Sequence, residues 1–107
     1  MISDETIKRI IRFTKERDWD QFHSPENLAK SISIEAGELL ECFQWDGVHY
    51  DRDAVREELA DVMNYCILLA DKLNLDLDQI INEKVDQNAQ KYPVDKAKGT
   101  SKKYTEL

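Results

Sequence analysis

Two long stretches of the chain repeat apolar residues at intervals of three and four, and one short polar loop separates them. The first stretch runs from Ser24-Pro25 to about Trp45, and the second from about Ala54 to Leu73. Such intervals place apolar side chains on one face of an α-helix. Because the intervening segment "DGVHYDRD" is short, the two predicted helices should pack as antiparallel neighbours.

Two further helices are predicted outside this pair. Ser3 is a suitable N-cap for a helix that runs to about Arg17. Asp76 begins the other with the Asp-x-x-Gln spacing of a capping box, and Pro93 ends it near Tyr92. No stretch alternates polar and apolar residues for long enough to predict a strand. The sequence therefore predicts an all-α protein whose protomer is an antiparallel, four-helix bundle-like unit.

Length and composition agree with this architecture. A chain of 107 residues is the size of one domain, so we predict a single domain over residues 1–107. Residues 93–107 are basic and have no helical period, which predicts an irregular tail. Charged residues make up 35% of the chain and apolar residues 41%, a composition that suits amphipathic helices around a modest core.

The net charge limits the class of partner. At −7 the chain repels phosphate backbones, so we expect no nucleic-acid polymer as a partner. A small anionic ligand is compatible with this charge if a metal ion lies between them. No apolar run approaches 18 residues and the start of the chain has no apolar signal region, so we expect no membrane association. Cys42 and Cys66 fall within helical patterns, which indicates free thiols in a cytoplasmic protein.

A pair of acids borders the apolar stripe of each central helix on a helical wheel. The pairs are Glu35 and Glu38 on the first helix, and Glu58 and Asp61 on the second. An aromatic residue lies beside each pair, Trp45 in the first helix and Tyr65 in the second. The predicted core stripes are Leu28, Ile32, Ala36, Leu39, Leu40 and Phe43, and Val55, Leu59, Val62, Met63, Cys66, Leu69 and Leu73.

Antiparallel packing should bring the two acid pairs together at one rim of the core. Carboxylates at a half-buried rim repel each other by on the order of several kcal/mol, so they either take up protons or hold a cation. Oxygen-only ligands favour hard divalent ions, which predicts Mg²⁺, with Mn²⁺ as a possible substitute. A solvated acidic helix face is the plain alternative. A di-iron site is a weaker one, because it requires Glu-x-x-His and both histidines, His23 and His49, fall in predicted loops.

The residues around these acids resemble a known family. "EAGELLE" followed by "EELADV" is similar to the E-x-x-E … E-x-x-D pattern of the MazG-like all-α nucleotide pyrophosphohydrolases. The stretches "ERDWDQFHSPENL", "EAGELLECFQW", "EELADVMNY", "NAQKYP" and "KYTEL" resemble the dCTP pyrophosphatase branch in order and spacing. The resemblance extends over about Ile7 to Leu107.

The resemblance implies an enzyme of nucleotide-pool housekeeping, a nucleotide diphosphatase. It would cut a dNTP, with dCTP as the expected substrate, between the α- and β-phosphates and release the monophosphate and pyrophosphate. The implied catalytic residues and Mg²⁺ ligands are Glu35, Glu38, Glu58 and Asp61. Among the implied substrate contacts, Trp45 would stack on the base and Tyr65 would line the site from the second central helix. The others are Trp19, Asp20, Gln21, Phe22 and His23 around the nucleoside, and Lys84, Asn88, Lys91 and Tyr92 near the phosphates.

One departure bears on the base. Some members have a histidine on the first helix that approaches the base, where this chain has Ile10, Ile11 and Arg12. A broader hydrolase of several dNTPs or modified nucleotides is therefore an alternative, and a non-enzymatic helical interaction module is another. The aromatic residues also have a structural alternative as core or closing residues of the bundle.

Association of several copies is the last expectation. Ile67 and Leu68 lie off the main stripe, so a lone bundle should leave them exposed. A small bundle gains core by pairing, which predicts a homo-oligomer, and the resemblance implies a tetramer built as a dimer of dimers.

Overall fold

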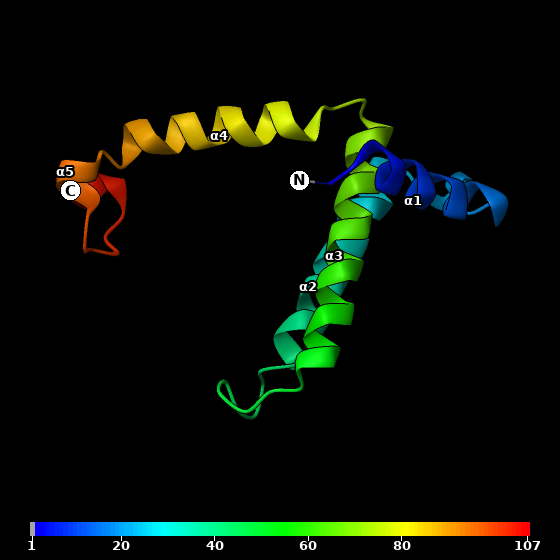
Figure 1. Cartoon of the computed structure of the whole chain (residues 1–107), viewed down its shortest axis with the longest axis horizontal. Helices are drawn as coiled ribbons and strands as arrows, with labels where there is room; N and C mark the ends of the chain where they lie inside the picture. Colours follow the sequence, from blue (N-terminus) through cyan, green and yellow to red (C-terminus); the bar gives the residue numbers. More distant parts are fainter. Residues whose placement is uncertain (1) are drawn as a thin grey trace. The chain divides into compact units, whose positions relative to one another are not determined.

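The computed structural model describes residues 2–107 and consists of helices and connecting loops (Figure 1). The main helices are α1 (Asp4–Glu16), α2 (Pro25–Glu41), α3 (Arg52–Lys72) and α4 (Leu77–Lys91), and the short ones are η1 (Asp20–Phe22), α5 (Val94–Ala97) and η2 (Tyr104–Glu106). Residues 2–107 contain no strand, so the predicted all-α class with four main helices is confirmed.

The chain divides into two compact units. The first ends at Leu75 and holds α1, η1, α2 and α3, while the second begins at Asp76 and holds α4, α5 and η2. The prediction of a single domain over the whole chain stays a prediction. Every site residue described below that the structure brings together belongs to the first unit.

Side-chain caps start the four main helices, and Ser3 and Asp76 begin theirs where the sequence predicts them. The Ser3 hydroxyl accepts the Thr6 N–H, and the carboxylate of Asp76 accepts the Gln79 N–H, both at 3.2 Å. Ser24 caps α2, with Pro25 in the first turn, and Asp51 caps α3. These bonds satisfy N–H groups that have no partner within the helix.

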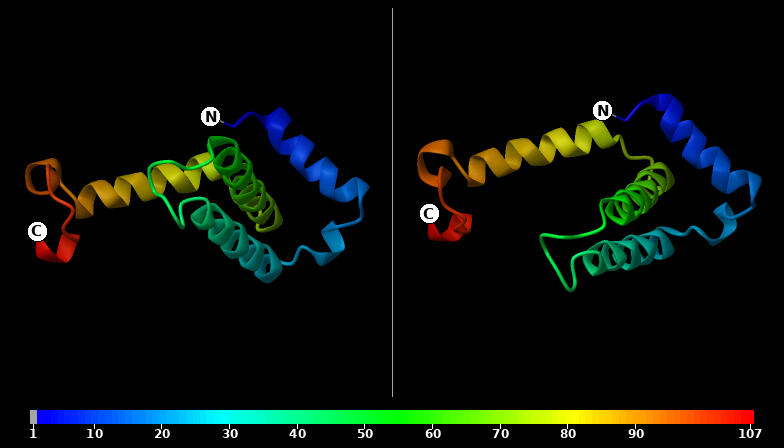
Figure 2. Two further views of the ribbon diagram at one scale, coloured as in Figure 1. Left: turned by 90° about the horizontal axis from the view of Figure 1, so that it is seen from below. Right: turned by 60° about the horizontal axis from the view of Figure 1, so that its bottom comes forward.

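Helices α2 and α3 lie side by side and antiparallel, joined by the loop between Glu41 and Arg52 (Figure 2). α1 packs against α3. Over the part of the chain that the structure describes, the most buried apolar side chains are Leu28 from α2 and Ile67, Leu68 and Ala70 from α3, with exposed fractions of 0%, 3%, 8% and 6%. The core of the first unit therefore lies at the start of α2 and the C-terminal half of α3.

The wheel prediction of the core was wrong in one respect. Ile67 and Leu68, expected to be exposed, are buried, whereas Leu59 and Leu40 from the predicted stripe are 50% and 71% exposed. The wheel assumed that the widest apolar arc faces the neighbouring helix. In the structure α3 is covered on two sides, because α2 and α1 both pack on it, and α1 helps to cover the side that bears Leu68.

The end of α2 also differs from the prediction. The helix was expected to reach Trp45 but ends at Glu41. The N–H groups of Cys42, Phe43 and Gln44 bond to carbonyls three residues back, so the chain tightens out of the α-helix over these residues. Trp45 therefore lies in the following loop and is 90% exposed.

A left-handed residue ends α3. Asn74 has φ +55°, and the Leu75 N–H bonds back to the Ala70 carbonyl at 2.8 Å. This arrangement satisfies a carbonyl that the helix leaves unpaired and turns the chain out of the helical path.

The predicted irregular tail contains regular turns. Pro93 directly precedes α5, and the fixed φ angle of proline suits the start of a helix. Within the second unit, Tyr104 of η2 packs edge-on against Tyr92, with ring centroids 6.0 Å apart, and the Lys91 ammonium lies 5.0 Å from the Tyr104 ring centroid. Residues 93–107 therefore fold back on the end of α4.

Candidate active site

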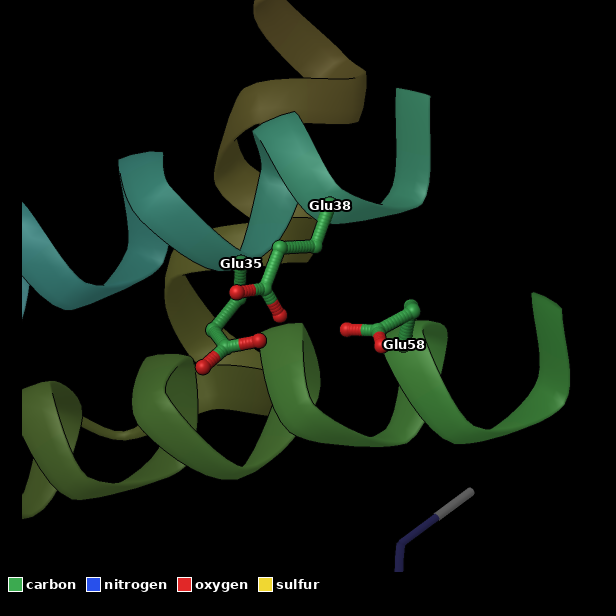
Figure 3. A group of neighbouring side chains, drawn as sticks. All are labelled: Glu35, Glu38 and Glu58. Atoms are coloured by element: carbon green, nitrogen blue, oxygen red, sulfur yellow. The ribbon is translucent and has the colours of Figure 1, made fainter. Parts of the chain in front are cut away.

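Three carboxylates converge between α2 and α3 (Figure 3). One carboxylate oxygen from each of Glu35, Glu38 and Glu58 lies within 4.8 Å of the other two. Glu35 and Glu38 project from α2 and Glu58 from α3, so the antiparallel pair brings together acids that are about twenty residues apart in the sequence. We call these three residues the acid cluster.

Two members of the acid cluster are placed where carboxylates are costly. Glu35 and Glu58 are half-buried, and the Oε2 atom of each is buried without a hydrogen-bond partner within residues 2–107. An unpaired buried carboxylate oxygen costs free energy that a bound cation would recover. The chemistry of the donors, carboxylate oxygens only, fits a hard divalent ion such as Mg²⁺.

Burial changes the protonation of the cluster. Loss of solvent raises the pKa of Glu35 to about 7, and the adjoining Glu38 carboxylate adds to the rise. Loss of solvent also raises the pKa of Glu58, again with Glu38 as the next contributor. Glu35 therefore keeps its proton to a higher pH than an ordinary glutamate, and a bound cation would displace that proton.

Asp61 lies one turn after Glu58 on α3 and faces a pocket next to the acid cluster. The pocket has a volume of about 460 Å³, within the range of small-molecule sites. Its walls come from α1, α3 and the segment that follows α1. The lining residues are Thr6, Arg9, Ile10, Phe13, Thr14, Trp19, His23, Asp61, Asn64, Tyr65 and Leu68.

Aromatic pairs form much of the pocket wall. The rings of Phe13 and Trp19 meet edge-on with centroids 5.7 Å apart, and those of His23 and Tyr65 meet edge-on at 6.3 Å. Flat aromatic surfaces and a few polar groups suit a planar heterocycle.

The segment from Trp19 to His23 was expected to border a nucleoside, and only its two end residues contact the pocket. Trp19 and His23 line it. Asp20 instead accepts a hydrogen bond from the Lys72 ammonium at 2.9 Å, and this ammonium lowers the pKa of Asp20. The Gln21 amide donates to the carboxylate and carbonyl of Asp18, at 2.9 and 3.0 Å. Phe22 is 61% exposed.

The remaining five predicted contacts stay predictions. Trp45 lies in the exposed loop after α2 and is not among the lining residues. The other four, Lys84, Asn88, Lys91 and Tyr92, belong to the second unit. There Asn88 accepts the Tyr92 N–H through its backbone carbonyl at 2.8 Å.

Sequence reasoning missed several pocket residues, of which Arg9 and Asn64 are the most polar. Asn64 follows Asp61 by three residues, so the helical period already places the two on one face. No side-chain hydrogen bond from Asn64 occurs within residues 2–107, which leaves its amide available to a ligand. Arg9 is the one arginine or lysine in the described lining. Ile10 also lines the pocket.

Comparisons with known proteins identify the family of the chain. The model of the MazG-like family matches residues 30–107. The chain is 42% identical to dCTP pyrophosphatase 1 of Mus musculus over 96% of its length, and 42% identical to dCTP pyrophosphatase 1 of Homo sapiens over the same share. It spans 66% of the length of each of these relatives.

A solved structure shares the fold. The crystal structure of a pyrophosphatase from Archaeoglobus fulgidus matches with a TM-score of 0.75 at 36% identity, over 84% of this chain and 91% of that one. The family model covers most of the chain, and sequence and structure agree on the relationship. The chain belongs to the MazG-like family.

Proposed function

We propose that the chain is a metal-dependent nucleoside triphosphate pyrophosphohydrolase that acts on a dNTP, preferably dCTP. The observation that carries this proposal is the pair of buried, unpaired oxygens of Glu35 and Glu58 beside a pocket with aromatic walls. The first feature suits a divalent ion and the second a nucleoside. A triphosphate is the class of ligand that would use both at once. The relatives named dCTP pyrophosphatase 1 support the same reaction.

Glu35, Glu38, Glu58 and Asp61 would hold the divalent ion, which would offset the charge of the triphosphate and polarise its oxygens. Arg9 is placed in the pocket to neutralise further phosphate charge. One of the four carboxylates would accept the proton of a water molecule that attacks the α-phosphorus. The bond between the α-phosphorus and the oxygen that bridges to the β-phosphate then breaks, and pyrophosphate leaves with that oxygen.

The nucleoside would occupy the pocket between α1 and α3. Tyr65 and Trp19 offer ring surfaces, and the Asn64 amide offers an NH₂ donor group and a carbonyl acceptor. Asn64 and Tyr65 follow Asp61 by about one turn of α3, so a nucleoside beside them would lie next to phosphates held at the acids. Broader activity on several dNTPs is the second candidate, since an isoleucine at position 10 offers no hydrogen bond to select a base.

Turnover of a panel of dNTPs and NTPs with Mg²⁺ tests this proposal. We expect dCTP to give the monophosphate and pyrophosphate, and Glu38→Gln to lower kcat by about 10²-fold or more, as loss of a group that stabilises charge does. Glu41→Gln, on the same helix outside the acid cluster, is the matched control and should retain activity. Release of inorganic phosphate in place of pyrophosphate, or unchanged turnover by Glu38→Gln, would reject the assignment.

The same chain should act as a homo-oligomer, and the tetramer built as a dimer of dimers is the arrangement proposed. Leu40, Leu59 and Met63 are exposed by 71%, 50% and 39% on the paired helices α2 and α3. Large apolar side chains gathered on neighbouring helices suit a second copy of the chain. Sedimentation equilibrium of the purified protein tests this assignment, and a monomer at all concentrations would reject it.

A further inference from the structure

The ion pair between Lys72 and Asp20 is unlike every other polar side-chain contact in residues 2–107. It joins residues 52 positions apart, with the Nζ and Oδ1 atoms 2.9 Å from each other. All other side-chain hydrogen bonds and ion pairs among the described residues join positions five or fewer apart. Among residues 2–107, Lys72 is the one side chain of α3 that makes a polar contact with the segment after α1.

The tied segment carries two pocket residues. Trp19 and His23 flank η1, whose first residue is Asp20. Local bonds shape this segment: the Trp19 N–H donates to the Thr14 carbonyl, and the Gln21 amide closes on Asp18, which has φ +56°. These bonds set the curvature of the segment, but none of them reaches α3.

Lys72 lies at the far end of the pocket from the acids. Asp61, Tyr65, Leu68 and Lys72 recur at helical spacing and share one face of α3. Asp61 lies next to the acid cluster at one end, and Lys72 holds η1 at the other, roughly 16 Å along the helix axis. Contact with Asp20 at this end joins η1, which Trp19 and His23 flank, to α3.

We propose that Lys72 and Asp20 are positioning residues that hold the aromatic wall of the nucleoside pocket against α3. This inference rests on the proposed function for the identity of the ligand. Asp20 thus acts through Trp19 and His23 and does not touch the nucleotide. The Lys72 side chain is 30% exposed and that of Asp20 51%, so the pair is accessible to substitution without opening the core.

Steady-state kinetics of Lys72→Met with dCTP and Mg²⁺ is the first test. A partly exposed pair is worth up to about a fivefold change in an equilibrium, so KM should rise by about fivefold while kcat stays within about twofold. Lys72→Arg should restore KM, because it keeps the charge, and the exchanged pair Asp20→Lys with Lys72→Asp should restore part of it. Lys30→Met is the matched control, because Lys30 also pairs with an acid, Glu26, but lies outside the pocket lining.

Fluorescence of Trp19 gives a readout that needs no turnover. In a Trp45→Phe background, Lys72→Met should increase acrylamide quenching of Trp19, and Lys30→Met should leave it unchanged. Quenching and KM unchanged in both Lys72→Met and Asp20→Asn, with thermal unfolding intact, would overturn the proposal. Increased quenching in a protein that turns over no nucleotide would support the positioning role and reject the proposed function.

Discussion

The two halves of α3 differ in the kind of side chain that they bury. The C-terminal half buries apolar side chains, with Ile67, Leu68 and Ala70 nearly inaccessible to solvent. The N-terminal half buries part of Glu58 and leaves Leu59 half-exposed. Both halves pack within the unit that holds α1, α2 and α3, so we interpret the difference in burial as a difference in role. The C-terminal half stabilises the fold, and the N-terminal half holds charge close to a neighbouring helix at a cost that a ligand can offset.

The largest effect on stability should come from the C-terminal half. Ile67→Ala removes a side chain that is 3% exposed, and we expect the free energy of unfolding to fall by about 2–4 kcal/mol, because a cavity remains. Urea unfolding followed by circular dichroism measures this change. A loss as small as that of an exposed apolar residue would erase the contrast between the halves.

Magnesium should stabilise the N-terminal half in a pH-dependent way. Protons and Mg²⁺ compete for the acid cluster, so the ion should raise the melting temperature more near pH 8 than near pH 5.5. At a free concentration ten times the dissociation constant, the gain is about 1.4 kcal/mol. Thermal unfolding with Mg²⁺ or with EDTA measures it. An equal gain at both pH values would argue against binding at these carboxylates.

Without metal, the same carboxylates should make the protein less stable as the pH rises. The pKa of Glu35 is about 7 in the folded chain against an ordinary value of 4.5, so folding binds a proton between these values. The free energy of unfolding should therefore fall as the pH rises from about 4.5 to about 7.

Glu35→Gln isolates this contribution. It should flatten the pH dependence and, near pH 8 in EDTA, stabilise the protein by on the order of 1 kcal/mol, a value discounted for the remaining solvent contact of Glu35. Glu57→Gln on the exposed side of α3 is the control. If the variant shows the same dependence of unfolding free energy on pH as the parent, the proton taken up on folding does not bind to Glu35.

The smallest effect on the isolated protomer should come from Leu59→Ala. Leu59 is 50% exposed, so we expect a loss below about 1 kcal/mol under conditions where the chain is a monomer. The same change should weaken the proposed homo-oligomer, which sedimentation velocity would record as a shift to lower mass. A loss as large as that of Ile67→Ala in the monomer would show that the two halves do not differ.

Local chemistry made the helices predictable from the sequence. Ser3, Ser24, Asp51 and Asp76 are caps whose side chains bond to the next few N–H groups, so a short window contains all the information. The proximity of Glu35 and Glu58 was also predictable, because a short loop makes neighbouring helices antiparallel.

The remaining differences depend on packing that a helical wheel does not describe. The helical wheel predicted that Leu59 is buried and Ile67 exposed, because it assigns the core to the widest apolar arc. It takes no account of α1, which covers a second side of α3. The contact between Asp20 and Lys72 joins distant positions with no shared period. The four-residue helix α5 is too short to produce a period at all.

The left-handed Asn74 has a consequence for the length of α3. Three residues, Leu73, Asn74 and Leu75, separate the last residue of α3 from the cap of α4. Left-handed backbone costs most residues about 1–2 kcal/mol, whereas asparagine visits it more readily because its short polar side chain can bond locally. Asn74→Gly should therefore keep the end of α3 in place, and Asn74→Val should make that end fray.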